Sequence, residues 1–380
     1  MSTSKAIPTN EVKLSQRPED AGFNSAQLEV LDSHIIDLIN KKQIRAGAYI
    51  ISKNDAIIAH KAIGYRMFDD DSMPFLPDTI RRVASVTKVF VATSILQLVE
   101  KGRLRLDQPV STILDEFKNP MFEKVNILHL LTHTSGIRPD PGIFFEPYPL
   151  DWFGGKEDWI KEMLRGLPVT CPGQEWRYSS AGFTILAEVV SRVSGIHFEK
   201  YVIENITKPL GMADSSFYPP EESIDRICFS AECEKKWFDG DRKKGRPEWA
   251  PPRGGGGLFS TLPDLRTLGQ MLINKGTYGD ARILSRKTVE AMTRRQVYAK
   301  NYCWGNGGGE MEYGLGMNVY SNNTFLSPGS FSHEGAGLCG LYMDPVENMV
   351  LAYICPLCDG VEWSPEAVIN LRNIVWAGII

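Results

Sequence analysis

A serine and a lysine stand three residues apart at the head of an apolar segment. They are Ser85 and Lys88, in the stretch RRVASVTKVFVATSILQLVEKGRL of residues 81–104. Residues i and i+3 of a helix share a face, so the serine hydroxyl and the lysine amine can meet. A serine hydroxyl becomes a good nucleophile when a base takes its proton, and a lysine is such a base where burial keeps it neutral. The spacing alone is weak and favours a lysine that extends from a packed helix into solvent, but this helix is apolar on nearly every face, which makes that exit less favourable.

Two further stretches carry polar groups of the right kind. WRYSSAGF places Tyr178, Ser179 and Ser180 directly before a helical pattern, which would hold a phenol and a hydroxyl rigidly. FSHEGAGLCGLYMDP places His333, followed by a glutamate and a glycine, before an apolar strand, and a glycine there lets a substrate approach the backbone closely.

These three motifs, in this order and at these separations, resemble the serine β-lactamase and penicillin-binding-protein superfamily. The similarity is to its branch of AmpC-like β-lactamases, D-alanyl-D-alanine carboxypeptidases and family VIII esterases. It extends over residues 20–380. Further phrases that carry it are LVEKGRLRLDQPVSTIL, ILHLLTHTSGI, CPGQEWRYSSAGF, PLGMADSSF and GGLFSTLPDL.

The resemblance implies a role for each matching residue. Ser85 would be the nucleophile that forms an acyl-enzyme, with Lys88 and Tyr178 sharing the work of the base. The backbone N–H groups of Ser85 and Ala336 would form the oxyanion hole. His333 would take the catalytic-site position that a lysine holds in the K-T-G motif of related enzymes.

Two motifs depart from the family pattern in ways that bear on the substrate. Ser180 stands where the second motif usually has an asparagine, and Glu334 and Ala336 stand where a hydroxyl residue usually binds a substrate carboxylate. We expect Ser180, Glu334 and Gly335 to contact the substrate. A carboxylate near Glu334 would meet like charge, which favours neutral esters or amides; strand alternation could instead turn Glu334 away from the cleft.

An aromatic segment, GIFFEPYPLDWFGG, holds Phe145 and Trp152 among several other rings. It could form the wall of an acyl pocket, and core packing or a subunit contact fits its composition equally well.

Other patterns favour no metal and no cofactor. Cys355 and Cys358 have C-x-x-C spacing without a well-spaced second pair, and His133 lies four residues after His129 without the glutamate of H-E-x-x-H. The glycine run at 254–257 lacks the following Lys-Ser/Thr of a phosphate-binding loop.

The elements predicted around these motifs define an α+β fold of the β-lactamase/transpeptidase-like type. We expect an amphipathic helix at 24–42, a hairpin turning at 53–55, a buried helix at 85–102, strands from about 313, and a last helix beginning at Ser364 and Pro365. One catalytic domain would span 20–380, with an α/β lobe from 20–80 and 255–380, a helical lobe at 81–254, and an N-terminal extension at 1–19.

Composition restricts the partners. The 380 residues carry a net charge of −4, with 43% hydrophobic and 23% charged residues, which argues against nucleic-acid binding. The N-terminus lacks the apolar core of a secretory signal, no segment has 18 uncharged apolar residues, and seven cysteines fit a reducing compartment. These features favour a cytoplasmic protein whose partner is a small molecule; they leave its oligomeric state open.

The leading hypothesis is a carboxylesterase or acyl-transferring serine hydrolase. A peptidase acting on D-amino-acid substrates is second and a β-lactamase third. A protein of the same fold that binds ligands without turnover is the alternative from another class, because Ser180 replaces the usual asparagine.

Overall fold

An antiparallel sheet forms the centre of the molecule. The computed structural model describes residues 7–14, 16–138, 158–245, 250–299, 310–322, 325–361 and 365–380. Within them the sheet has nine strands, in the order β1 (Thr9–Glu11), β3 (Ala56–Gly64), β2 (Ala46–Lys53), β13 (Met349–Ile354), β12 (Cys339–Asp344), β11 (Ser330–Gly335), β10 (Asn318–Tyr320), β9 (Met311–Tyr313) and β8 (Val297–Ala299).

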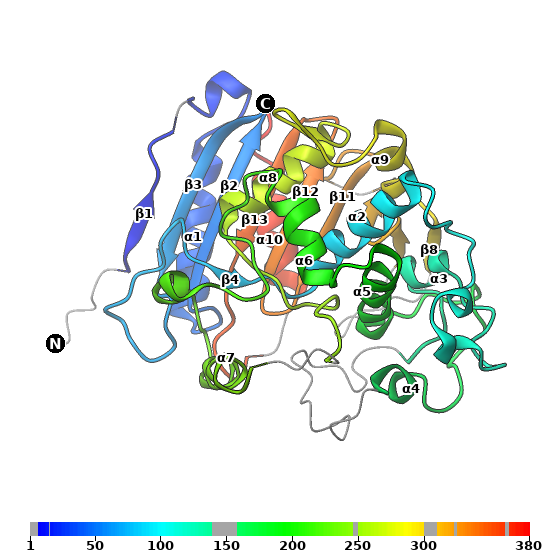
Figure 1. The fold of residues 1–380 in the computed structure, drawn as a ribbon. Coiled ribbons are helices and arrows are strands. Elements are labelled where there is room, and N and C mark those ends of the chain that lie inside the picture. The colour runs from blue at the N-terminus through cyan, green and yellow to red at the C-terminus, as the bar shows by residue number, and fades with distance from the viewer. Residues whose placement is uncertain are drawn as a thin grey trace.

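The two ends of the chain meet in the middle of this sheet. The N-terminal strand β2 pairs with the C-terminal strand β13, with Ile51 opposite Leu351 (Figure 1). The expected hairpin joins β2 to β3 through Asn54 and Asp55, whose φ angles of 53° and 67° match the left-handed turns that favour Asn and Asp. The prediction that both chain ends build one sheet is confirmed.

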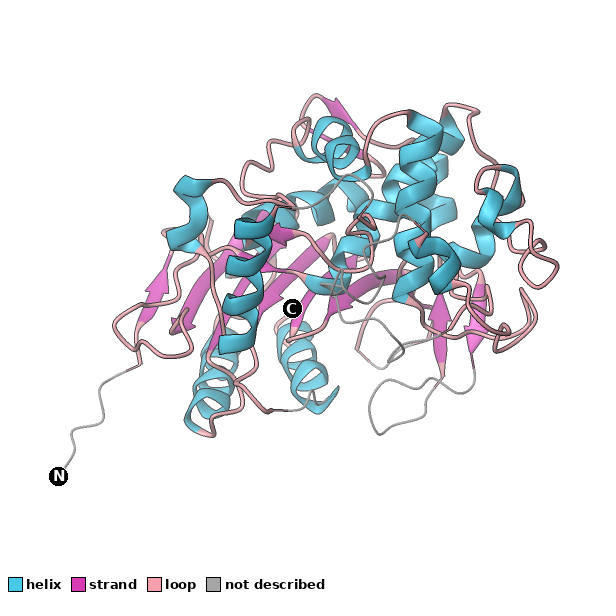
Figure 2. Ribbon diagram, turned by 60° about the horizontal axis from the view of Figure 1, so that its bottom comes forward, coloured by secondary structure: helices cyan, strands magenta, loops and turns pink. Residues whose placement is uncertain are grey.

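Helices cover both faces of the sheet (Figure 2). The described helices are α1 (Ala26–Asn40), α2 (Thr87–Glu100), α3 (Ile127–Leu131), α4 (Trp159–Met163), α5 (Ser180–Ser194), α6 (Phe198–Val202), α7 (Glu232–Lys244), α8 (Leu262–Ile273), α9 (Arg286–Met292) and α10 (Pro365–Trp376). Two short ribbons, β4 (Arg81–Arg82) with β5 (Phe259–Ser260) and β6 (Thr277–Tyr278) with β7 (Ala281–Arg282), lie outside the main sheet.

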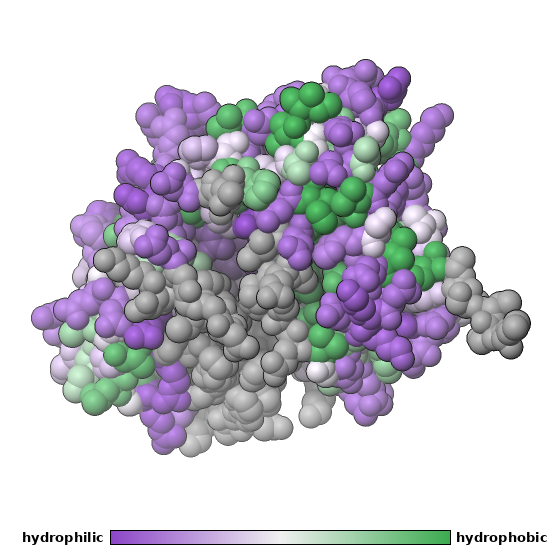
Figure 3. Space-filling view, turned by 180° about the vertical axis from the view of Figure 1, so that it is seen from behind, coloured by the Kyte–Doolittle hydropathy of each residue, from purple (hydrophilic) through white to green (hydrophobic). Residues whose placement is uncertain are grey.

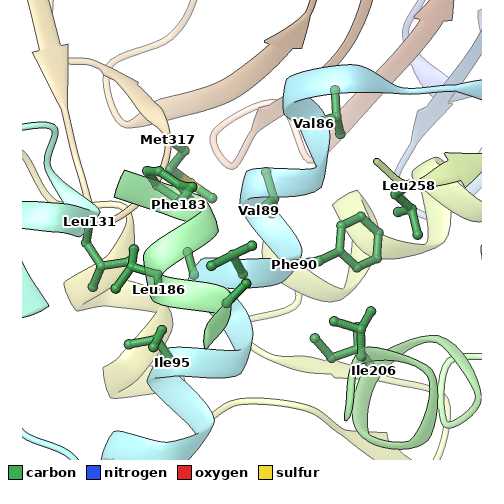
Figure 4. Packing of buried hydrophobic residues seen from close by; sticks show 14 of the residues in the cluster. Val86, Val89, Phe90, Ile95, Leu131, Phe183, Leu186, Ile206, Leu258 and Met317 are labelled. Atoms are coloured by element: carbon green, nitrogen blue, oxygen red, sulfur yellow. The ribbon is translucent and has the colours of Figure 1, made fainter. Parts of the chain in front are cut away.

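The two faces of the sheet belong to separate apolar cores. Helices α1 and α10 contact each other on one face, where Leu31 and Trp376 are buried. Helix α8 packs on the other face against β2, β12 and β13, and its core continues into α2 and α5. In Figure 4, Val89 of α2 lies on the side of Phe183 of α5, whereas Phe90 points to the other side of α2, toward Leu258, within this second core.

Several boundaries differ from the sequence prediction. The helix expected from residue 85 begins at Thr87, because residues 84–86 form a separate 3₁₀ turn. The segment YGLGMNVY contributes to two strands, β9 and β10, with glycines between them. Residues 9–11, expected in an N-terminal extension, form edge strand β1 of the main sheet. The lobe boundaries near residues 80 and 254 stay a prediction.

The surface seen from behind is mainly hydrophilic where the chain is described, with apolar side chains in small separate groups (Figure 3). None of the described helices combines the length and apolar character needed to cross a bilayer.

Candidate active site

Ser85 lies in a strained turn that directly precedes helix α2. Its neighbour Ala84 has a φ of 43°, which is unfavourable for a residue with a Cβ. The Thr87 hydroxyl holds this turn by donating to the Ala84 carbonyl at 2.6 Å and accepting from the Leu258 N–H at 3.1 Å. Ser85 itself is partly exposed, so a substrate can reach its hydroxyl although its neighbours in the turn are buried.

Lys88 is fully buried one turn further on, and its amine contacts three oxygen atoms. Its Nζ lies 3.0 Å from Ser85 Oγ, 3.1 Å from Ser180 Oγ and 2.6 Å from the Gly255 carbonyl oxygen. A buried lysine is costly without such partners. The contact between Ser85 and Lys88 that the sequence predicts is therefore present.

The three contacts suit two protonation states of Lys88. A carbonyl oxygen only accepts, so one Nζ proton always points to Gly255. The two serine hydroxyls can each donate or accept. An ammonium can therefore donate to all three oxygens, and a neutral amine can turn its lone pair to the Ser85 hydroxyl, as a general base must.

Two aromatic rings close the space around the amine. Lys88 Nζ lies 4.8 Å from the ring centroid of Tyr178 and 5.8 Å from that of Phe183. Tyr178 is therefore beside Lys88, as its expected share in the base function requires. The rings and the apolar core around α2 (Figure 4) limit the access of water to the amine.

Ser180 takes its place from the start of helix α5. The preceding residue, Ser179, is the N-cap: its hydroxyl accepts from the Gly182 N–H at 3.4 Å and donates to the Arg138 carbonyl at 2.9 Å. Ser180 is the first helical residue and accepts from Lys88. The side chain that departs from the family pattern thus still contacts the lysine.

The third motif approaches the Ser85 turn at strand β11. A Cβ on Gly335 would lie 2.4 Å from the Val83 carbonyl oxygen and 3.2 Å from the Ala84 Cβ, so only glycine permits this contact. The exposed Ala336 follows at once, in the turn between β11 and β12. The two strands thus bring Ala336 close to the Ser85 turn, and the oxyanion hole between their N–H groups stays a prediction.

A directed chain of hydrogen bonds connects the second motif to the third. His133 Nδ1 accepts from the Ser179 N–H at 3.1 Å, so the proton of a neutral His133 is on Nε2, which lies 3.2 Å from the Tyr313 hydroxyl. His333 Nδ1 lies 2.8 Å from the Glu334 carbonyl and must donate to it. Its Nε2 then accepts from the Tyr313 hydroxyl at 3.5 Å.

Burial keeps both imidazoles of this chain neutral. It lowers the pKa of His333 to about 3, with the charge of Lys88 as a second cause. Burial also lowers the pKa of His133 well below its usual value, assisted by Lys88 and His333. The position of the third motif where related enzymes have a cationic lysine therefore holds an uncharged group.

Glu334 does not face this site, which corrects our expectation that it meets the substrate. His333 pairs across the sheet with Leu341 of the α8-side core, whereas the Glu334 carboxylate accepts from the Tyr342 hydroxyl on the α1/α10 side. Burial raises the pKa of Glu334, against the opposing effects of Tyr342 and Arg372. Alternation along β11 is the physical reason, because successive side chains point to opposite faces.

Phe145 and Trp152, the expected walls of an acyl pocket, lie outside the described residues. Among the residues that are described, no group of three or more His, Cys, Asp or Glu side chains is arranged to hold a metal ion.

The sequence motifs do not identify three groups that hydrogen-bond within the candidate site. These groups are the Gly255 carbonyl, His133 and Tyr313. The glycine run at 254–257 was a signal for the first, since a Cβ on Gly254 would lie 2.5 Å from the Phe183 carbonyl oxygen and force the loop away from α5. In the sequence His133 stands only in a pair with His129 that lacks the glutamate of a metal motif. Tyr313 had no sequence signal, because the sheet alone brings it next to His133.

The comparison with protein families agrees with this geometry. The family model described as Beta-lactamase matches residues 31–367. The chain therefore belongs to the beta-lactamase family, which confirms the resemblance and the fold class derived from the sequence.

Individual relatives span several activities. A Salmonella agona (strain SL483) protein named "Putative D-alanyl-D-alanine carboxypeptidase" is 25% identical, covering 89% of this chain and 84% of that protein. The solved structure of EstCE1, described as a hydrolase with promiscuous acyltransferase activity, has a TM-score of 0.74 at 20% identity, over 93% and 99% of the two chains. An octameric penicillin-binding protein homologue from Pyrococcus abyssi has a TM-score of 0.70 at 26% identity, over 93% and 79%.

Proposed function

We propose that this protein is a serine hydrolase that forms an acyl-enzyme on Ser85 and acts on neutral esters. The observation that carries the proposal is the 3.0 Å contact between Ser85 Oγ and the fully buried Lys88 Nζ. A nucleophile within hydrogen-bond reach of a base that is itself held by other groups is the arrangement that covalent catalysis needs.

In the acylation step, Ser85 Oγ attacks the ester carbonyl carbon while its proton passes to the neutral Lys88 amine. The negative charge that develops on the carbonyl oxygen would be stabilised by the N–H groups of Ser85 and Ala336. Collapse of the tetrahedral intermediate breaks the bond to the alcohol. The departing oxygen takes a proton from Lys88, directly or through Tyr178, and leaves the acyl group on Ser85.

Water then attacks the acyl-enzyme carbonyl carbon and gives a proton to the same base. As the tetrahedral intermediate collapses, the bond to Ser85 Oγ breaks, Oγ takes that proton back from the base, and the acid is released. Throughout both steps the Gly255 carbonyl and the Ser180 hydroxyl keep Lys88 Nζ next to Ser85. The contact to Ser180 argues against the alternative of a non-catalytic binding protein, because the replacement of asparagine has not left Lys88 without a partner at this position.

The preference for neutral substrates rests on His333 rather than on Glu334. A neutral imidazole in the third motif provides no positive charge to bind a carboxylate, whereas penicillins and peptides ending in D-alanine both carry one. The relative named as a carboxypeptidase makes D-alanine-terminated peptides the second candidate.

Steady-state kinetics on three substrate classes tests the proposal. The purified protein would be assayed with p-nitrophenyl esters of several chain lengths, with a peptide ending in D-alanyl-D-alanine, and with nitrocefin. We expect kcat/KM to be highest for an ester, and we expect Ser85→Ala to remove turnover of every substrate because its hydroxyl is the nucleophile.

A higher kcat/KM for the peptide or for nitrocefin would overturn the preference for neutral esters. Substantial ester turnover by a folded Ser85→Ala variant would overturn the assignment of Ser85 as the nucleophile. A thermal unfolding curve like that of the wild type is the control, since a partly exposed serine contributes little to the core.

A further inference from the structure

A pocket lies against strand β4, which ends three residues before Ser85. It has a volume of about 300 Å³, at the lower end for a small-molecule site. Ribbon strands β4 and β5 and helix α7 form its walls. Phe229, Trp237 and Phe259 line it together with Cys228 and Cys233.

The charged groups of this pocket already have partners. Arg81 makes two 2.6 Å contacts with the Glu234 carboxylate and also donates to the Cys228 carbonyl at 3.1 Å. The Arg82 guanidinium stands 5.4 Å from the ring centroid of Trp237. With its ions paired and its aromatic rings turned inward, the pocket suits an apolar group rather than a charged one.

The pocket is coupled to the catalytic turn through the backbone. Strand β4 ends three residues before Ser85. In the turn that carries Ala336, a Cβ on Gly337 would lie 3.4 Å from Arg81 Nη2. The same turn is fixed to the residues before Ser85 by the Cys339 thiol, which donates to the Val83 carbonyl at 3.2 Å. The pocket therefore begins next to the predicted oxyanion hole.

We propose that this pocket binds the apolar acyl chain of the ester whose carbonyl carbon reacts with Ser85. The inference rests on the proposed function and adds the substrate's acyl half to it. The base must protonate the departing alcohol, so the alcohol lies on the Lys88 side. The acyl chain then extends away from Lys88, and the pocket between β4, β5 and α7 is an apolar space that adjoins the turn carrying Ala336.

Narrowing the pocket tests the proposal by kinetics. Cys233 is exposed and lines the pocket, and Cys171 is an exposed cysteine that does not line it. The variant Cys233→Phe should lower the ratio of kcat/KM for p-nitrophenyl octanoate to that for p-nitrophenyl acetate by at least tenfold. The matched control Cys171→Phe should leave this ratio within twofold of the wild type. A ratio that Cys233→Phe does not change would overturn the proposal.

Protection from alkylation tests the same pocket without turnover. In the Ser85→Ala variant, the rate at which N-ethylmaleimide modifies Cys233 would be followed by peptide mass spectrometry, with Cys171 as the internal reference. Octanamide should slow the modification of Cys233 at least threefold, and acetamide should not. Equal rates of Cys233 modification with and without octanamide would overturn the proposal that this pocket binds an acyl chain. An absence of ester turnover together with octanamide protection would overturn the proposed function alone.

Discussion

The two faces of strand β11 use polar side chains in opposite ways. On the α8 side, His333 is one end of a hydrogen-bond chain that runs through Tyr313 and His133 to the backbone of Ser179. On the α1/α10 side, the next residue, Glu334, is bonded to Tyr342 within an apolar core. One residue along the strand thus separates a group next to the candidate site from a group that only stabilises the sheet.

This contrast shows that a sequence motif locates a segment near the site, whereas the side-chain alternation of the strand determines which residues of that motif face the site. The third motif contains a glutamate and a histidine side by side, and only the histidine shares a face with Ser85. Substitutions on the α8 side should therefore change catalysis, and substitutions on the α1/α10 side should change stability.

The largest expected effect is that of Lys88→Met, which removes the base but keeps an unbranched apolar side chain. We expect kcat on the best ester to fall by about 10²- to 10⁴-fold, the range found for general acid–base groups. The matched control is Lys61→Met, because Lys61 is a half-buried lysine on the α1 side, bonded to Asp32 at 2.6 Å. Equal losses of kcat in both variants would remove the distinction between the faces.

The second expected effect is a pH dependence of stability that His333 causes. An unfolded chain protonates histidine near pH 6.5, whereas folded His333 stays neutral down to about pH 3. Between these values the unfolded state binds more protons, so the free energy of unfolding falls as the pH falls, by up to about 1.4 kcal/mol per pH unit for this group. In His333→Gln this contribution is absent.

Urea unfolding at pH 7 and pH 5 measures this contribution of His333 to the free energy of unfolding. The wild type should lose about 2 kcal/mol more between these two pH values than His333→Gln does. An equal loss in both proteins would show that His333 does not stay neutral in the folded state.

The third expected effect concerns Tyr313, the central link of the chain. Tyr313→Phe removes the hydroxyl that orients His333, and we expect kcat to fall about fivefold while KM stays close to the wild type, since one hydrogen bond of this kind contributes about 1 kcal/mol. Tyr320→Phe is the control, because its hydroxyl bonds at 2.8 Å to Ser332, which precedes His333 on β11 and faces the opposite side of the sheet. A larger change in KM than in kcat would assign Tyr313 to substrate binding.

The smallest expected effect is that of Tyr342→Phe on the α1/α10 side. Loss of its hydrogen bond to Glu334 should lower the free energy of unfolding by about 1 kcal/mol. The kcat/KM ratio between neutral and carboxylate-bearing substrates should not change. A selective increase in kcat/KM for carboxylate-bearing substrates in this variant would show that Glu334 faces the substrate.

Much of the fold could be predicted because local signals and burial agree. The Asn54–Asp55 turn, the amphipathic helix α1 and the apolar helix α2 all have patterns that a single segment carries. The exact start of α2 could not be predicted, because the 3₁₀ turn at Ala84 depends on contacts from Thr87 and Leu258, and the latter is distant in sequence.

The same limit applies to the site. Ser85 and Lys88 are three residues apart, and the 3₁₀ turn that leads into α2 preserves the contact that this spacing predicts. The partners that hold Lys88 come from α5 and from the glycine loop, and Tyr313 reaches His133 across 180 residues. Such contacts depend on tertiary packing. The orientation of Glu334 depends on which face of β11 meets α8, which strand alternation alone leaves undecided.

Covalent labelling with a fluorophosphonate, followed by peptide mass spectrometry, tests most directly the claim that Lys88 activates Ser85. We predict a single phosphonyl adduct on Ser85 in the wild type, and a labelling rate at least 100-fold lower in Lys88→Met. An adduct on a different residue, or equally fast labelling of Ser85 without Lys88, would contradict the account.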